Sequence, residues 1–146
     1  MLYQLLKTTH SLTAYLVLGF LLFSVVNALL GLLQKRAYTK KDLRIDLFAL
    51  IFTHLQVTLG LILYVVTPLL QSWGALGAKV MKDAYLRKML VEHPFGLVAA
   101  ILITIGWSLH KKQKTDQGAF KKILIFYAIG LLLILGVLPW KTWLAF

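Results

Sequence analysis

Four long apolar runs without a charged side chain constrain the fold of this chain more than any other feature. Residues 8–34, 47–78, 94–109 and 123–140 contain no Asp, Glu, Lys or Arg. A helix that crosses a bilayer needs roughly 20 mostly apolar residues, with a range of about 17–25. The first two runs exceed that length, and the other two reach it once flanking residues are included. The sequence therefore predicts an all-α fold, an integral membrane four-helix bundle.

The limits of these runs predict one transmembrane domain over residues 1–146. Its four spans are expected over residues 5–33, 45–67, 86–109 and 123–138. Pro68 is expected to end the second span, because a proline stops a helical pattern near the residue that precedes it. The Gly-rich segment 69–85 is partly amphipathic, and we expect it to lie along the membrane surface.

Composition narrows the classes of function. The chain has 146 residues, is 60% hydrophobic, carries a formal net charge of +11 and has no cysteine. The lack of cysteine excludes disulfides, iron–sulfur clusters and thiolate metal sites. Because the basic residues crowd the ends of the spans, anionic lipid explains the charge, and we expect no nucleic-acid partner.

A Ser-His-Asp set, a metal-hydrolase motif and a phosphate loop are all missing from the sequence, so an electron-transfer or accessory subunit is expected rather than a self-sufficient enzyme.

The distribution of positive charge predicts an orientation. The first and third loops hold ten basic residues, namely Lys35, Arg36, Lys40, Lys41, Arg44, Lys111, Lys112, Lys114, Lys121 and Lys122. The opposite side holds six, namely Lys7, Lys79, Lys82, Arg87, Lys88 and Lys141. The positive-inside rule places the first and third loops in the cytoplasm, so both termini face outward.

Small and weakly polar residues recur on one side of each span and predict the faces that pack inside the bundle. The first two spans contribute His10, Thr13, Ser24, Asn27, Gly31, Thr53, Gln56, Gly60 and Thr67. The last two contribute His93, Gly96, Ala100, Thr104, Trp107, Tyr127, Gly130 and Val137. Bundle packing alone explains most of this pattern. Gly60, Gly96 and Gly130 would also leave room for a flat macrocycle between helices.

Four histidines lie in or beside the spans and are the candidate site residues. Ionisable side chains inside a membrane are usually functional, and imidazole is a common axial ligand of haem iron. With a helical rise of about 1.5 Å per residue, His10 and His93 enter their spans at similar depth, whereas His54 lies about 10–15 Å deeper. His93 and His10 are therefore our first-choice ligands for the iron of a b-type haem.

Two histidines carry open alternatives. His54 is either a ligand to the same or a second haem iron, or a polar residue hydrogen-bonded to a neighbouring Thr, Gln or backbone carbonyl. His110 is followed by two lysines, and we expect it at the membrane interface rather than at the haem.

The charged residues near the spans are expected to form ion pairs. Glu92 is expected to pair with Arg87 or Lys88, and its alternative role is to accept a proton from a ligating histidine or to carry protons near a quinone. Arg87 and Lys88 face either haem propionates or lipid. Asp46 is expected to pair with Arg44 or a nearby lysine.

Four segments of the sequence together resemble a family of small bacterial four-helix, cytochrome-b-like membrane proteins. The segments are THSLTAYLVLG, FTHLQVTLGLILYVVTP, VEHPFGLVAAILITIG and the final LPW. The resemblance covers nearly the whole chain and rests on the order and spacing of short motifs. It implies haem b between the helices and electron transfer, with His10, His54 and His93 as the matching residues.

We therefore expect a b-type haem protein of the respiratory chain or a quinol-linked subunit, multi-pass in a bacterial inner membrane. Expected partners are membrane lipid, other membrane subunits or further copies of this chain, and a quinone. The main alternative is a haem-free accessory or scaffolding subunit of a larger membrane complex. A small transporter is a weaker alternative, because glycine and proline here fall mainly near span ends rather than at the midplane.

Overall fold

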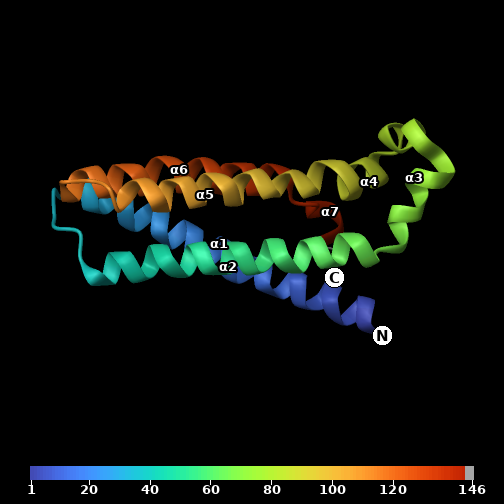
Figure 1. The fold of residues 1–146 in the computed structure, drawn as a ribbon, viewed down its shortest axis with the longest axis horizontal. Helices are drawn as coiled ribbons and strands as arrows, with labels where there is room; N and C mark the ends of the chain where they lie inside the picture. The colour runs from blue at the N-terminus through green and yellow to red at the C-terminus, as the bar shows by residue number, and fades with distance from the viewer. Residues whose placement is uncertain (144–146) are drawn as a thin grey trace.

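A computed structural model describes residues 1–143 and is an antiparallel bundle of four long helices (Figure 1). Three are regular: α1 (Leu2–Leu33), α2 (Lys40–Val66) and α6 (Asp116–Val137). The other runs from Ala84 to His110 and ends in α5 (Gly96–His110). All four are long and apolar enough to cross a membrane. The prediction of an all-helical chain with four such helices is confirmed.

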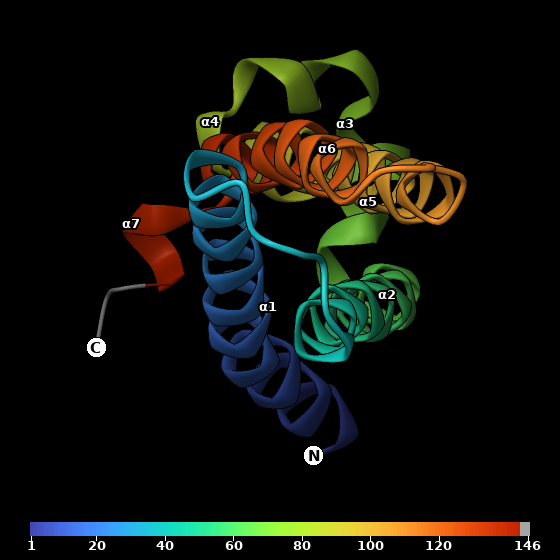
Figure 2. The same cartoon turned by 90° about the vertical axis from the view of Figure 1, so that its left-hand side faces the viewer.

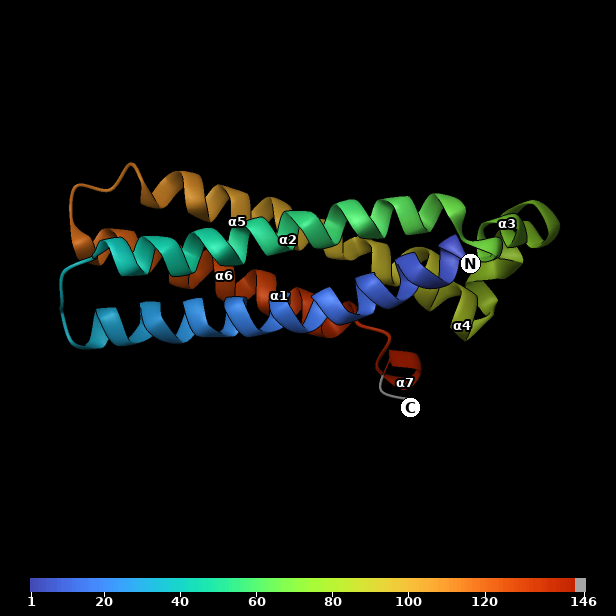
Figure 3. The same ribbon diagram turned by 90° about the horizontal axis from the view of Figure 1, so that it is seen from below.

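Neighbouring helices along the chain are also neighbours in space. Viewed end-on, α1, α2, α5 and α6 follow one another around the bundle, and α6 packs back against α1 (Figure 2). The α2–α5 contact is the least extensive of the four. Figure 3 shows the loops 34–39 and 111–115 together at one end, while the N-terminus and the segment around α3 (Gln71–Leu76) lie at the other.

All four long helices begin before their predicted bounds, and α2 and α6 do so by five and seven residues. α2 starts at Lys40 rather than 45, because Thr39 and Asp42 form a capping box. α6 starts at Asp116 rather than 123, because the Thr115 hydroxyl accepts a hydrogen bond from the Gly118 N–H at 3.1 Å. Charged residues such as Lys40, Lys41 and Lys121, which were expected in loops, therefore lie within α2 and α6.

α1 ends in a Schellman motif. The Lys35 N–H donates to the Leu32 carbonyl and the Arg36 N–H donates to the Gly31 carbonyl, both at 3.2 Å. Lys35 adopts a φ of 52°, the left-handed conformation that this motif requires and that glycine usually supplies. The turn directs Arg36 back over the bundle.

The third long helix is irregular where a single regular helix over 86–109 was expected. It comprises α4 (Ala84–Arg87), a π-helical turn (Lys88–Glu92), a 3-10 turn (His93–Phe95) and α5. Pro94 has no N–H to donate to the carbonyl four residues earlier, that of Leu90. The Tyr64 hydroxyl donates to this carbonyl instead, at 3.2 Å. The irregular turns therefore coincide with the proline and with His93.

Short helices make up the rest of the described chain. α2 ends at Val66, so Pro68 follows its end as predicted, and a 3-10 turn (Pro68–Leu70) leads into α3. A second 3-10 turn (Gly77–Lys82) buries Val80 completely, and α7 (Trp140–Trp143) follows α6.

The core is built from the predicted inner faces together with larger apolar side chains such as Leu21, Ile103 and Tyr127. Ser24, Gly31, Thr53, Ala100, Tyr127 and Gly130 are buried as expected. Thr104 is exposed, although its hydroxyl contacts His54 of α2 as an inner-face residue would. The looser α2–α5 contact leaves this side of α5 uncovered.

Candidate functional site

His10 of α1 and His93 of the irregular third helix lie against each other. Their ring centroids are 5.9 Å apart and their planes meet at 84°. Both side chains are half-buried. The shared depth predicted from the helical rise is therefore present in the fold, and it brings together two imidazoles that are 83 positions apart in the sequence.

The hydrogen bonds of His93 fix the orientation of its ring. Its Nδ1 lies 3.3 Å from the Val137 carbonyl at the end of α6. A hydrogen bond from Nδ1 to a backbone carbonyl is the usual support of a metal-ligating histidine, because it leaves Nε2 with a free lone pair. The irregular turn at 93–95 brings the ring within reach of this carbonyl.

His10 is anchored through its backbone rather than its ring. The Gln56 amide donates to the His10 carbonyl at 2.8 Å and lies 3.4 Å from His10 Nε2. Thr13 in turn donates to Gln56 Oε1, which holds the amide in place. His10 Nδ1 is buried and makes no hydrogen bond within residues 1–143. Buried polar atoms are nearly always paired, so this nitrogen is an exception that needs an explanation.

The three glycines expected to make room for a macrocycle have different surroundings. A Cβ at Gly60 would lie 3.0 Å from His10 Cε1, so this glycine gives the His10 ring its space. A Cβ at Gly96 would meet Val137 at 3.5 Å. A Cβ at Gly130 would meet Ile103 at 2.9 Å, which makes Gly130 a helix-packing residue. Only Gly60 adjoins the histidine pair directly.

His54 lies apart from this pair. Its Nδ1 contacts the Leu50 carbonyl at 2.8 Å, and its Nε2 contacts the Thr104 hydroxyl at 3.1 Å. Within residues 1–143, no three His, Cys, Asp or Glu side chains gather as a metal site. His54 therefore does not complete a set with His10 and His93. Its contacts are those of the alternative prediction, a hydrogen bond to threonine and to a backbone carbonyl.

Arg87, Lys88 and Glu92 form a cluster of ion pairs at the same end of the bundle as the histidine pair. Glu92 accepts a hydrogen bond from Arg87 Nε at 2.9 Å and forms an ion pair with Lys88 Nζ at 3.3 Å, as expected. Arg87 also donates to the Met81 carbonyl, and Lys88 donates to the Gly136 carbonyl. The ion pairs stay within the third helix, whereas the two contacts with carbonyls connect it to α6 and to the preceding 3-10 turn.

Asp46 does not pair with Arg44 or a lysine, which corrects the sequence-based expectation. Its side chain is 1% exposed and accepts hydrogen bonds from the hydroxyls of Ser24 and Tyr38, both at 2.5 Å. Burial, followed by the nearby Asp46 carboxylate, raises the pKa of Tyr38 well above its usual value. The helical phase places Asp46 on the inner face of α2, where hydroxyls rather than cations lie opposite.

A second carboxylate, not identified from the sequence, holds the first loop. Arg36 donates to both oxygens of Asp42, at 2.7 and 2.9 Å, and to Asn27 Oδ1 at 2.8 Å. The hydrogen bonds from Arg36 to Asp42 raise the pKa of the guanidinium group. The TKKD capping pattern of residues 39–42 was the available signal for Asp42.

His110 ends α5 at the opposite end of the bundle from the histidine pair. It lies at the helix end, where an interfacial residue was expected, but it is 4% exposed and so is covered by protein. Tyr38 and Trp107 pack against it, with ring centroids at 5.6 and 4.6 Å. The first loop folds over the end of α5 and covers the ring.

Comparison with known proteins adds no further assignment, because no family model, curated protein or solved structure matches the chain.

Proposed function

We propose that this chain is an integral membrane protein that binds one b-type haem through His10 and His93 and transfers single electrons. The observation that carries the proposal is the contact between these two half-buried imidazoles on separate helices. Two imidazoles from separate helices can supply two nitrogen ligands to one haem iron.

The surroundings of the pair suit this role. The carbonyl of Val137 lies 3.3 Å from His93 Nδ1, and among the described residues 1–143 the buried His10 Nδ1 has no hydrogen-bond partner. Gly60 has no side chain, so the His10 ring can pack directly against the backbone of α2. A bound haem iron would supply reversible one-electron chemistry, and His10 and His93 would be its ligands. The rigid support of both residues would keep the two ligands in place in either oxidation state.

The membrane location is supported by the outer surface of the bundle. Leu22, Phe23 and Leu132 are 56%, 55% and 68% exposed near the middle of their helices. Exposed apolar patches larger than a few hundred Å² are rare on soluble monomers, whereas lipid covers them at no cost. We place the chain in a bacterial inner membrane, with the loops 34–39 and 111–115 in the cytoplasm and both termini outside. Its electron partner would be a quinone or another membrane subunit.

The test is a visible spectrum of the protein purified in detergent after expression with supplied haem. We expect b-type bands in the dithionite-reduced minus oxidised spectrum and about one haem per chain by pyridine haemochrome, since one haem takes two axial ligands. His93→Ala and His10→Ala should each lose most of this haem.

Two histidine variants serve as controls. His110→Ala should retain haem, because His110 lies at the far end of the bundle. His54→Ala should also retain it, and a halved haem content in this variant would instead indicate a second haem. A flat spectrum from folded, haem-supplied protein would contradict the proposal. A haem-free accessory subunit of a larger membrane complex would then be the better description.

A further inference from the structure

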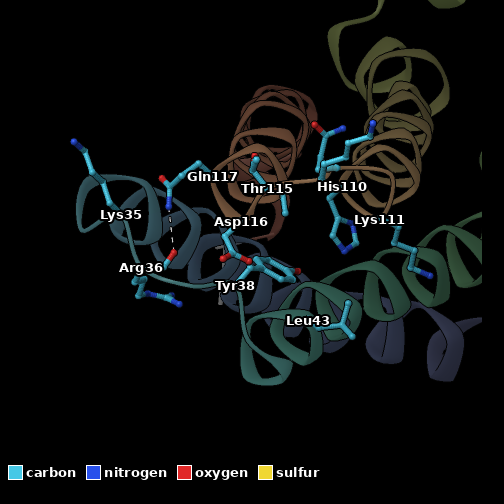
Figure 4. Close-up of a pocket in the computed structure, with 12 residues that line it drawn as sticks. Lys35, Arg36, Tyr38, Leu43, His110, Lys111, Thr115, Asp116 and Gln117 are labelled. Atoms are coloured by element: carbon cyan, nitrogen blue, oxygen red, sulfur yellow. Dashed lines mark hydrogen bonds between the residues drawn. The ribbon is translucent and has the colours of Figure 1, made fainter.

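A cavity of about 640 Å³ lies at the end of the bundle where the loops 34–39 and 111–115 meet. Its lining includes Lys35, Arg36, Tyr38, His110, Lys111 and Lys114 (Figure 4). The lining side chains come from the loops 34–39 and 111–115 and from α2, α5 and α6. The Gln117 amide ties the two sides together by donating to the Arg36 carbonyl at 3.1 Å. The cavity therefore lies between the loop that joins α1 to α2 and the loop that joins α5 to α6.

The charge around this cavity is mostly positive and mostly uncompensated. Asp42 already neutralises Arg36. Lys35, Lys111 and Lys114 are exposed, and within residues 1–143 none of them forms an ion pair. Lys111 lies over the Trp107 ring, 4.4 Å from its centroid. The Asp116 carboxylate also lines the cavity and opposes these cations. Three lysines against one free carboxylate favour an anionic ligand.

His110 provides a second and independent indication of a ligand. It lines the cavity although it is 96% buried, and Figure 4 shows its imidazole directed from α5 into the space beside Tyr38 and Leu43. Its Nδ1 is buried, and although the Gly106 and Trp107 carbonyls lie near the ring, no partner within residues 1–143 meets this nitrogen in hydrogen-bond geometry. A buried polar atom without a partner needs an explanation, and a bound polar group is one.

We propose that this cavity binds the phosphate group of an anionic phospholipid. The cavity lies at the ends of four apolar helices, which is the level of lipid headgroups in a spanning bundle. Basic pockets between helices at the cytoplasmic side are suited to such headgroups. The lysines compensate the phosphate charge, and His110 donates or accepts a hydrogen bond at its inner edge. This site depends on the proposed membrane insertion but not on haem.

The test is native mass spectrometry of the detergent-solubilised protein titrated with phosphatidylglycerol or with phosphatidylcholine. A lysine near an anionic lipid surface contributes roughly fivefold in affinity, so Lys35→Gln with Lys114→Gln should weaken phosphatidylglycerol binding by at least about fivefold. Both side chains are exposed, so folding should be unaffected. Phosphatidylcholine, which carries no net charge, should bind weakly to all variants.

The matched control is Lys40→Gln with Lys41→Gln, which removes the same charge from the same end of the bundle outside the cavity lining. This variant should bind phosphatidylglycerol within about twofold of the original chain, since exposed charges away from a site contribute little. Equal losses in the two double variants would overturn the proposal and indicate general charge attraction. Inorganic phosphate that competes at millimolar concentration would also overturn it, in favour of a free phosphate ion. The haem spectrum of both variants reports separately on the histidine site.

Discussion

Asp46 shows what a single buried carboxyl group requires in this bundle. It is nearly inaccessible, and the hydroxyls of Ser24 and Tyr38 donate to its two oxygens. The Tyr127 hydroxyl also donates to its backbone carbonyl at 3.1 Å. α1, α2, α6 and the first loop therefore meet at one residue. A buried polar group that is fully hydrogen-bonded specifies one arrangement of helices, whereas an unpaired one destabilises the fold.

Asp46→Leu should lower the free energy of unfolding, because it leaves the Ser24 and Tyr38 hydroxyls without an acceptor. We expect a loss of about 1–3 kcal/mol, the cost of unsatisfied buried donors. Asp46→Asn keeps an acceptor oxygen and should lose less. Unfolding in detergent, followed by circular dichroism, measures both. Asp116→Asn is the exposed control and should shift stability by less than about 0.5 kcal/mol. Equal losses in the Leu and Asn variants would show that the acceptor is not the stabilising feature.

Some glycines of the bundle lie at close contacts between helices, and others do not. A Cβ at Gly31 of α1 would lie 2.5 Å from the ring of Phe120, which is buried between α1 and α6. A Cβ at Gly19, also in α1, would meet nothing within 4 Å. In lipid, helices gain stability from close packing because the tails offer no hydrophobic drive between them. The contact at Gly31 therefore sets the approach of α1 to α6.

Gly31→Ala and Gly19→Ala form a matched pair on one helix. Gly31→Ala should destabilise the bundle by about 1–3 kcal/mol, because an added methyl group overpacks a filled site. Gly19→Ala should be neutral or stabilising by up to about 1 kcal/mol, since alanine favours helix more than glycine does. The same unfolding assay compares them. If both variants have the same stability, the close contact between α1 and Phe120 does not hold the helices together.

At the scale of the whole molecule, the two ends of the bundle differ in chemistry. One end carries the histidine pair and the self-contained cluster of Arg87, Lys88 and Glu92. The other carries the basic cavity and the Arg36–Asp42 pair. Because the four helices are antiparallel, the loops 34–39 and 111–115 lie at the same end of the bundle. The connectivity therefore gathers their basic residues at one end, away from the histidine pair. The more basic end is expected in the cytoplasm.

The absence of native cysteine makes this orientation easy to test. A single cysteine at Lys112, in the loop 111–115, should react with a membrane-impermeant maleimide only after intact cells are permeabilised. A single cysteine at Lys82, in the segment before α4, should react in intact cells. Both residues are exposed, so access is not limited by the fold. The reverse labelling pattern would invert the proposed topology. Labelling of both positions in intact cells would mean that the helix between them, Ala84–His110, does not cross the membrane.

The apolar runs of the sequence determined the four helices and their alternating direction, because a helix is the structure in which a lipid-embedded chain satisfies its own backbone hydrogen bonds. The rise per residue also determined that His10 and His93 share a depth. Only the tertiary structure decided which side chains meet. Pro94 interrupts the third helix near His93, and Asp46 faces hydroxyls rather than Arg44. His110 is buried beneath a loop that comes from a distant part of the chain. Such contacts depend on helix rotation and loop path, and hydropathy carries little information about either.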